Sequence, residues 1–361
     1  MAINKERKSK RIKVYVAMSG GVDSSVAAAL LKKRGFDVIG VFMKPWSPNL
    51  STTTLKVVRG KIVDNCLWKQ DREDAMRVAS KLDIPLLTWD FSKEYKKEVG
   101  DYMIREYRAG RTPNPDVMCN KEIKFGLFFK KATEEGADFI ATGHYVRAKK
   151  GKLFVAKDKN KDQSYFLWTL KKNIVEKCLF PIGDYLKPEV RKLAKKFNLS
   201  NHAKKDSQGV CFIGPLNMKE FLTKHIKPKK GKIIHMNGQV IGAHDGVYYY
   251  TIGQRHGLDI GTGSGPYYVI SKDLKKNIIY VGSEKDLLSK EAKVKNISWL
   301  KESIKLPGAV SVRLRYRADL KNGILDKNGA LTLKSPERAI TKGQSAVFYR
   351  GSEMLGGGII I

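Results

Sequence analysis

Cysteine, acidic side chains and long apolar runs are all scarce in this 361-residue sequence. The few cysteines, too few for a disulfide framework in a chain of this length, are Cys66, Cys119, Cys178 and Cys211. No apolar run approaches the roughly 18 residues that a membrane span needs. The basic start, MAINKERKSKRIK, lacks the apolar stretch of a signal peptide. We therefore expect a cytoplasmic protein without membrane contact, in which any important cysteine is catalytic or metal-bound.

The shortage of acidic residues leaves the chain strongly basic. It has 69 Lys and Arg against 36 Asp and Glu, a formal net charge of +33. Such an excess favours a polyanionic partner, because each phosphate that is neutralised releases counterions. The lysines are spread along the whole chain, so a general lysine enrichment without functional meaning is the alternative.

Strand and helix patterns alternate through the first half of the chain. Apolar runs predict strands over 12–18, 37–43, 84–90 and 137–142. Helical spacing or proline at a first turn predicts helices over 24–34, 71–82, 93–108, 121–135 and 188–197. This alternation indicates an α/β domain with a parallel sheet covered on both faces. Such sheets bind ligands at the carboxyl ends of their strands, where the sequence places a glycine turn, Met43 and Gly143.

Past about residue 215 the pattern changes to short alternating runs separated by Asn-Gly pairs. These pairs, at Asn237-Gly238, Asn322-Gly323 and Asn328-Gly329, predict hairpin turns. We expect an α/β domain over 1–215, a small central domain over 216–283 and a β-barrel or sandwich over 284–361.

The glycine turn reads AMSGGVDSS and joins the first predicted strand to a helix. Its two glycines permit positive φ and close approach to a ligand, and the serines and free helix N–H groups surround an anion. It lacks the lysine of a Walker loop, so it suits a pyrophosphate that leaves rather than a phosphoryl group that is transferred. Asp23 is a candidate Mg²⁺ ligand. A generic turn with capping serines is the alternative.

Two of the cysteines lie in loops shaped by proline or glycine. Residues 110–120 read GRTPNPDVMCN and present Asp116 with Cys119, which we expect just before a helix, where Lys121 and the helix dipole lower a thiol pKa. Residues 204–214 read KKDSQGVCFIG and carry Cys211. Two reactive cysteines suggest sulfur chemistry, in which one carries a persulfide and the other releases the sulfur. Cys66 and Cys178 are predicted to be buried apolar residues.

The glycine turn resembles the SGGxDS loop of the PP-loop ATP pyrophosphatase superfamily. This resemblance implies an adenine nucleotide alpha hydrolase-like domain that splits ATP into AMP and pyrophosphate. Over nearly the whole chain, the sequence is similar to bacterial tRNA-specific 2-thiouridylases, also called tRNA-uridine 2-sulfurtransferases. The segments that carry the similarity are MSGGVDSS, GRTPNPDVMCNKEIKF, ATGHY, KDQSYFLW, KKDSQGVCFIG, YTIGQRHGL and RYR. The segment 44–69 departs from the family, because it is rich in Ser, Thr and Lys where relatives are often acidic.

The family resemblance implies a role for each matching residue. The implied ATP contacts are Ala17, Met18, Ser19, Gly20, Gly21, Val22, Asp23, Ser24, Met43 and Gly143. The implied contacts with the target base are Asn114, Pro115 and Asp116. Cys119 would release sulfur, Cys211 would carry the persulfide, and Asp116 would assist as a base or by orientation. Further implied tRNA contacts are His144, Lys161, Asp162, Gln163, Arg315, Tyr316 and Gln344. Without the resemblance, Arg315 and Tyr316 read as an exposed barrel strand and His144 as a hydrogen-bonded structural histidine.

The implied reaction is thiolation of the wobble uridine, at tRNA position 34. ATP with Mg²⁺ adenylates the C2 oxygen, and the persulfide sulfur replaces AMP. An upstream sulfur-donor protein and a reductant for a Cys119–Cys211 disulfide are then needed as partners, besides the tRNA anticodon loop. Three alternatives stay open. The chain could be a synthetase that aminates a small substrate, an RNA-binding module without turnover, or an enzyme whose Asp116, Cys119 and Cys211 bind an iron–sulfur cluster.

Overall fold

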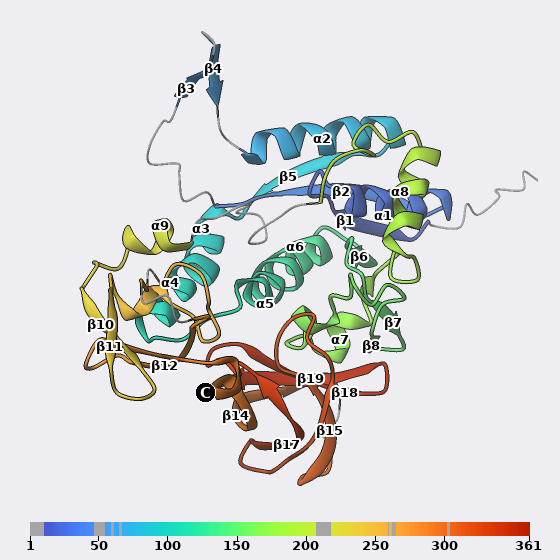
Figure 1. The fold of residues 1–361 in the computed structure, drawn as a ribbon. Helices are drawn as coiled ribbons and strands as arrows, with labels where there is room; N and C mark the ends of the chain where they lie inside the picture. Colours follow the sequence, from blue (N-terminus) through green and yellow to red (C-terminus); the bar gives the residue numbers. More distant parts are fainter. Residues whose placement is uncertain are drawn as a thin grey trace, which may run out of the picture.

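The computed structural model describes residues 11–46, 55–58, 61–64, 67–206, 218–258, 260–261, 265–301 and 304–361. In Figure 1 the parallel sheet lies at the top, the central domain at the left and the C-terminal barrel at the bottom. The helix labelled α5 and α6 runs between the sheet and the barrel. The predicted fold class, an α/β domain with a parallel sheet followed by a central domain and a β-barrel, is confirmed.

The N-terminal sheet has five parallel strands in the order β5-β2-β1-β6-β9. Their bounds are β1 Lys13–Ala17, β2 Asp37–Lys44, β5 Leu86–Asp90, β6 Phe139–Ala141 and β9 Cys178–Leu179. The chain runs outward from β1 to β5 and then returns to the other side of β1 with β6. The strand order therefore reverses between β1 and β6, and a crevice at this point is where such sheets bind ligands.

Helices cover both faces of this sheet because successive strand residues point to opposite sides. Val14 and Val16 of β1 pack against α1 (Val22–Lys33), α2 (Leu67–Leu82) and α8 (Lys187–Lys196). Tyr15 and Ala17 face the second layer. That layer holds α3 (Ser92–Tyr95), a π-helical segment (Lys96–Gly100) and the helix that contains Cys119. The next helix, α4 (Asp101–Arg108), packs its buried side chains against the central domain. Between β2 and α2, strands β3 (Leu55–Val58) and β4 (Lys61–Asp64) form a hairpin in the segment 44–69.

The helix with Cys119 begins earlier than the sequence analysis expected. It consists of α5 (Pro115–Met118), a π-helical segment (Cys119–Leu127) and α6 (Phe128–Glu134), without a break. Asn114 caps it by accepting a hydrogen bond from the Val117 N–H at 3.4 Å, and Pro115 occupies the first turn. The prediction that Cys119 precedes the helix is therefore wrong. Asn-Pro is itself the start signal, since proline fits the first turn.

The central domain has a four-stranded sheet in the order β11-β10-β13-β12. Its elements are α9 (Met218–Thr223), β10 (Gly231–His235), β11 (Val240–His244), a 3₁₀ turn (Val247–Tyr249), β12 (Tyr268–Asp273) and β13 (Ile278–Gly282). The predicted turn at Asn237-Gly238 is confirmed, because it joins the antiparallel pair β10 and β11.

Six strands of the C-terminal domain close into a barrel through pairing of β14 with both β17 and β19. A 3₁₀ turn (Glu284–Leu287) leads into β14 (Leu288–Trp299), β15 (Gly308–Arg313), β16 (Lys321–Leu325), β17 (Ala330–Arg338), β18 (Ser345–Arg350) and β19 (Glu353–Ile360). The predicted turn at Asn328-Gly329 is confirmed between β16 and β17. The turn predicted at Asn322-Gly323 is wrong. Gly323 lies within β16, where a Cβ would clash with the backbone of Thr332 on the neighbouring strand.

The N-terminal half of the chain contributes to the barrel sheet. The hairpin of β7 (Arg147–Lys149) and β8 (Lys152–Phe154) pairs with β19 and extends the sheet to eight strands. A 3₁₀ turn (Ser164–Leu167) and α7 (Lys172–Val175) follow this hairpin. The domain boundaries predicted at 215/216 and 283/284 stay predictions. Within the described part of the chain, no helix combines the length and the apolar character needed to cross a membrane.

A buried ion pair joins the segment after β8 to the barrel. The Asp162 carboxylate is 2% exposed and accepts hydrogen bonds from Arg313 Nη1 and Ser164 Oγ, both at 2.9 Å. Its other oxygen accepts the Ala156 N–H at 3.1 Å and the Ser164 N–H at 3.2 Å. Loss of the carboxylate would leave the Arg313 guanidinium buried without its counter-charge.

We expect Asp162→Ala to lower the free energy of unfolding by about 3–5 kcal/mol, because an uncompensated buried charge is left behind. Urea unfolding followed by circular dichroism would measure this loss. Glu73→Ala is the matched control, since it breaks the exposed Glu73–Arg77 pair and should cost under about 0.5 kcal/mol. Equal effects of the two substitutions would contradict the prediction.

Candidate functional site

The glycine turn lies at the point where the strand order reverses. Met18 ends the strand side of the turn, and its N–H donates to the Val41 carbonyl at 2.8 Å. Gly20 has a φ of +73°, and a Cβ there would clash with the Asp71 backbone, so glycine is required. Gly21 precedes α1 without any side chain capping that helix. The first N–H groups of α1 therefore remain available to an anion at the positive end of the helix dipole.

Gly143, which follows β6, packs directly on this turn. A Cβ at Gly143 would lie 2.6 Å from the Ser24 backbone nitrogen, so a larger residue there would push the turn and β6 apart. Met43, near the end of β2, is buried at 3% exposure. The expectation that the turn and Gly143 converge is confirmed, although they are far apart in the chain.

A lysine that the sequence analysis missed lies beside the turn. Lys187, at the start of α8, is 8% exposed, and its Nζ lies 2.7 and 2.9 Å from the two Asp23 oxygens. The same Nζ is 2.8 Å from Asp206 Oδ1. The Tyr145 hydroxyl also donates to Asp23 Oδ1, at 2.9 Å. The site therefore has a buried ammonium, supplied by another helix, next to the glycine turn of residues 17–25, which we call the phosphate turn from here on.

Asp206 is the second carboxylate that contacts Lys187, and it binds three cationic side chains in all. It accepts hydrogen bonds from Lys161 Nζ at 2.6 Å and from Arg191 Nη2 at 2.7 Å, besides its contact with Lys187. Lys161, implied as a tRNA contact, thus lies in the same network as the phosphate turn. Asp206 immediately precedes residues 207–217, which lie outside the described residues and contain Cys211.

Residues just before Asp206 support the back of the turn. The Asn201 side chain donates from Nδ2 to the Gly20 carbonyl and to Ser25 Oγ, both at 2.9 Å. Lys204 Nζ binds Asp71 and Asp74 of α2 at 2.7 and 2.6 Å. The segment 201–206 therefore fixes the phosphate turn and α2 at once. Tyr145 and Asp206 lie in ATGHY and KKDSQGVCFIG, two of the segments that carry the family resemblance. Near Lys187 the sequence indicates only a helix start, at Pro188.

Cys119 is fully buried, at 0% exposure, at the start of the π-helical segment. Its neighbour Asn120 is 2% exposed, and Asn120 Nδ2 donates to the Phe166 carbonyl at 3.4 Å. Asp116 is half-buried one turn earlier. π-Helical turns within α-helices occur frequently at functional sites. Cys178 is buried as predicted, and burial raises the pKa of its thiol; Cys66 lies outside the described residues.

The residues implied as tRNA contacts lie in different surroundings. His144 is buried, its Nδ1 is 2.8 Å from Thr142 Oγ1, and burial together with Lys124 holds its pKa well below the ordinary value. Gln163 accepts the Tyr145 N–H at 3.0 Å. Arg315 is exposed in the bend after β15 rather than in a strand, and the Tyr316 ring lies 4.4 Å from that of Phe166. Together, 143–145 link the phosphate turn to the Cys119 helix, since Phe125 of that helix contacts the His144 ring.

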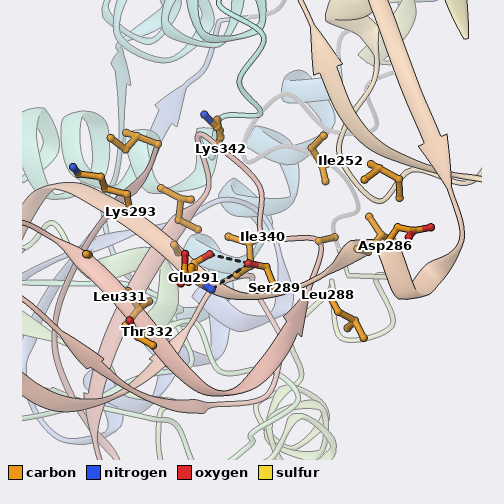
Figure 2. A pocket seen from close by; sticks show the side chains of 17 residues that line it. Ile252, Asp286, Leu288, Ser289, Glu291, Lys293, Leu331, Thr332, Ile340 and Lys342 are labelled. Carbon is orange, nitrogen blue, oxygen red and sulfur yellow. Dashed lines mark hydrogen bonds between the residues drawn. The ribbon is translucent and has the colours of Figure 1, made fainter. Parts of the chain in front are cut away.

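Two cavities adjoin the barrel, and one of them also touches the loop before the Cys119 helix. One, of about 830 Å³, is lined by Gly110, Arg111 and Thr112 together with Lys272 and Lys342. The other, of about 620 Å³, lies between the central domain and the barrel; Figure 2 shows Ile252, Leu288 and Ile340 on its walls. In this second cavity the Ser289 hydroxyl donates to the Glu291 carbonyl and accepts the Glu291 N–H, both at 3.1 Å.

Asp23 is the candidate Mg²⁺ ligand of this site. Both of its oxygens accept hydrogen bonds from Lys187. The carboxylate therefore already has one positive partner, to which a metal ion would add a second. Over the described residues, no group of three His, Cys, Asp or Glu side chains is arranged to hold a metal ion. The cluster alternative needs Cys211, which lies outside the described residues, and stays a prediction.

Three family models match successive parts of the chain. They are the tRNA methyl transferase HUP domain over 12–215, the tRNA methyl transferase PRC-barrel domain over 219–283 and the aminomethyltransferase beta-barrel domain over 289–360. The first of these matches alone covers more than half of the chain.

Full-length relatives agree with these matches. The chain is 44% identical to the tRNA-specific 2-thiouridylase MnmA of Bacillus velezensis, over 98% of this chain and 96% of that protein. It is 45% identical to the enzyme of the same name from Listeria monocytogenes, over 97% and 94%. Among solved structures it matches NMN synthetase from Francisella tularensis at 15% identity, over 58% of this chain and 71% of that one, with a TM-score of 0.34.

Asp206→Asn should remove an acid-sensitive part of the stability. Burial raises the pKa of Asp206, but hydrogen bonds from Lys161 and Lys187 outweigh it and lower the pKa to about 2. Because this pKa is near 3.9 in an unfolded chain, the carboxylate stabilises the fold above about pH 4, and the stabilisation is lost toward about pH 2.

We expect Asp206→Asn to cost about 1–2 kcal/mol at neutral pH and to flatten the acid loss of stability between about pH 4 and pH 2. Urea unfolding at a series of pH values would measure both effects. Asp319→Asn, at an exposed position, is the control. An unchanged slope in Asp206→Asn would show that the network does not lower the pKa of this carboxyl group.

Proposed function

This chain belongs to the tRNA-specific 2-thiouridylase family, and we propose that it catalyses ATP-dependent thiolation of the wobble uridine of tRNA. The observation that carries this proposal is the joining of two sites at one end of the sheet. The phosphate turn with Lys187 lies on one side of residues 143–145, and the Cys119 helix lies on the other. The residues proposed for activation and those proposed for sulfur transfer thus lie close together in one domain.

The phosphate turn would bind ATP through the residues implied from the sequence. The uncapped start of α1 and the Ser19 and Ser24 hydroxyls offer hydrogen-bond donors to phosphate oxygens. Lys187 would then stabilise the negative charge that develops on pyrophosphate as it leaves. Preorganised positive groups of this kind stabilise the transition state more than the ground state. Burial and the Asp23 carboxylate raise the pKa of Tyr145, so its hydroxyl stays protonated and orients Asp23.

We propose that ATP is used together with Mg²⁺ and that Asp23 is the carboxylate that would hold the ion. The metal would supply further charge neutralisation at the phosphates. Asp23 would share its oxygens between the ion and Lys187.

The sulfur step would use two cysteines. ATP adenylates the uridine C2 oxygen with release of pyrophosphate, and the terminal sulfur of a Cys211 persulfide attacks C2 and displaces AMP. The Cys119 thiol then attacks the remaining Cys211 sulfur, so that the thiolated base is released and a Cys119–Cys211 disulfide forms. Alternatively, Cys119 first frees the sulfur as hydrosulfide, which attacks C2. Because Cys119 is fully buried, its thiol has to be uncovered before it reacts. A sulfur-donor protein reloads Cys211, and a reductant opens the disulfide.

The tRNA partner is supported by the net charge of +33. The anticodon loop would reach Asn114, Pro115 and Asp116, and its uridine would leave the base stack, as bases in single-stranded RNA loops do. We propose that this takes place in the cytoplasm. Arg315 and Tyr316, beside Phe166, offer a cation and an aromatic ring for a neighbouring nucleotide.

The reaction is tested by nucleoside mass spectrometry of tRNA incubated with the protein, ATP, Mg²⁺ and a sulfide source. We expect 2-thiouridine with the wild type, and loss of the product with Cys119→Ser or Cys211→Ser when the sulfur comes from a persulfide donor. Cys178→Ser is the matched control, because its buried thiol lies in β9 and bonds to the Ile174 carbonyl. ATP consumption by the wild type without 2-thiouridine would contradict the proposed acceptor.

Lys187 provides a separate test of the activating step. We expect Lys187→Met to slow AMP formation about a hundredfold or more, because one charged group that stabilises the transition state is lost. Rapid-quench measurement of AMP would show this. Lys192→Met, which removes an exposed lysine from the same helix, should react at the wild-type rate. A wild-type rate in Lys187→Met would exclude the ammonium from the reaction.

A further inference from the structure

Gln344, which precedes β18 of the barrel, bonds to the loop that leads into the Cys119 helix. Its Nε2 donates to the Thr112 carbonyl at 2.9 Å and to the Pro113 carbonyl at 3.1 Å. Both hydrogens of one amide group are therefore used on two successive carbonyls of a different domain. This arrangement fixes the backbone immediately before Asn114, the cap of the helix.

The backbone of the same barrel turn adds a second connection. The Thr112 N–H donates to the Lys342 carbonyl at 2.9 Å. Gly343 has a φ of +93°, and a Cβ there would lie 2.7 Å from the Thr112 carbonyl oxygen. The turn can approach the loop this closely only because residue 343 is glycine. The Thr112 hydroxyl also lies 3.2 Å from that of Thr251, so the central domain meets the same residue.

The barrel also holds the segment 164–168, which lies next to the loop 111–114 at the start of the Cys119 helix. Ser345, which begins β18, accepts hydrogen bonds from the Tyr165 hydroxyl at its carbonyl, at 3.0 Å, and from Trp168 Nε1 at its Oγ, at 2.9 Å. The Ser164 and Tyr349 hydroxyls lie 3.1 Å apart. These bonds are buried, so water does not compete with them.

The two braced segments lie on either side of the start of the Cys119 helix. Residues 112–113 lead into the Asn114 cap, and Phe166 in the second segment accepts a hydrogen bond from Asn120. Displacement of either segment would move Asp116 and Cys119, which the proposed reaction needs near the uridine. The adjacent residues Gln344 and Ser345 therefore hydrogen-bond to both segments, Gln344 to 112–113 and Ser345 to 165–168.

We propose that Gln344 is a positioning residue: the barrel turn 341–345 sets the loop 111–114 and, through it, the start of the Cys119 helix for reaction with the bound base. This rests on the proposed thiolation. In this role the Gln344 amide acts on the protein, so its loss slows the chemical step and leaves tRNA binding intact. A direct tRNA contact would show the opposite pattern, since uniform binding changes affinity without changing the rate at saturation.

The proposal is tested on the full-length chain with Gln344→Met, which keeps the length of the side chain but removes its donors. Gly343→Ala is a second and independent disturbance of the same contact. We expect faster hydrogen–deuterium exchange of the amides in 111–118 in both variants. We also expect the single-turnover thiolation rate at saturating tRNA to fall about tenfold to a hundredfold, as small misplacements of reacting groups do. The dissociation constant for tRNA should stay within about twofold.

Gln239→Met is the matched control, because residue 239 is exposed next to the β10–β11 turn of the central domain. Unchanged exchange in 111–118 would overturn the proposal, as would weaker tRNA binding with an unchanged rate at saturation. Thermal melting of each variant separates global unfolding from the local effect. A lower thiolation rate with unchanged amide exchange in 111–118 would also contradict the proposal. The exchange measurement needs no turnover. It therefore tests whether the barrel turn 341–345 holds the loop 111–114 even if the wild type makes no 2-thiouridine.

Discussion

The ammonium group of Lys187, placed between the carboxylates of Asp23 and Asp206, is the interaction on which the catalytic domain depends. A buried lysine without counter-charges would be costly, and so would two neighbouring half-buried carboxylates without a cation, so the three groups stabilise one another. The cluster joins three parts of the chain: the phosphate turn, the start of α8 and the residue before the segment with Cys211. It thus connects the place where ATP would be cleaved to the place where sulfur would be carried.

Local patterns were enough to predict four of the five parallel strands, the helices that cover them and the phosphate turn, because hydrophobic periodicity and turn glycines report short-range structure. The strand β9 has two residues, too few to show such a pattern. Lys187 could not be predicted in this way, since 164 positions separate it from Asp23 and its own segment indicates no more than a helix start. The helix start at Asn114-Pro115 was readable from its cap and was placed too late. The turn predicted at Asn322-Gly323 was wrong for a different reason. A glycine that lets a neighbouring strand approach closely cannot be told in the sequence from a glycine that forms a turn.

The residues implied as RNA contacts illustrate a second limit of sequence comparison. Asp162 and Gln344 both match the family pattern, yet the structure gives each of them partners inside the protein. A sequence match identifies a required residue without saying whether it touches the substrate or holds another residue that does. The barrel combines both kinds of position, because its turn before β18 supports the catalytic loop while Arg315 stays exposed.

The pairing of β8 with β19 has a consequence for biosynthesis. Lys152 in β8 and Glu353 in β19 form an ion pair across 201 positions, so β19 leaves the ribosome long after β8. The edge of β8 that pairs with β19 therefore stays unpaired in the nascent chain until β19 has been synthesised. Contacts of such long sequence separation form slowly, so the pairing of β8 with β19 is a late step in the folding of the nascent chain.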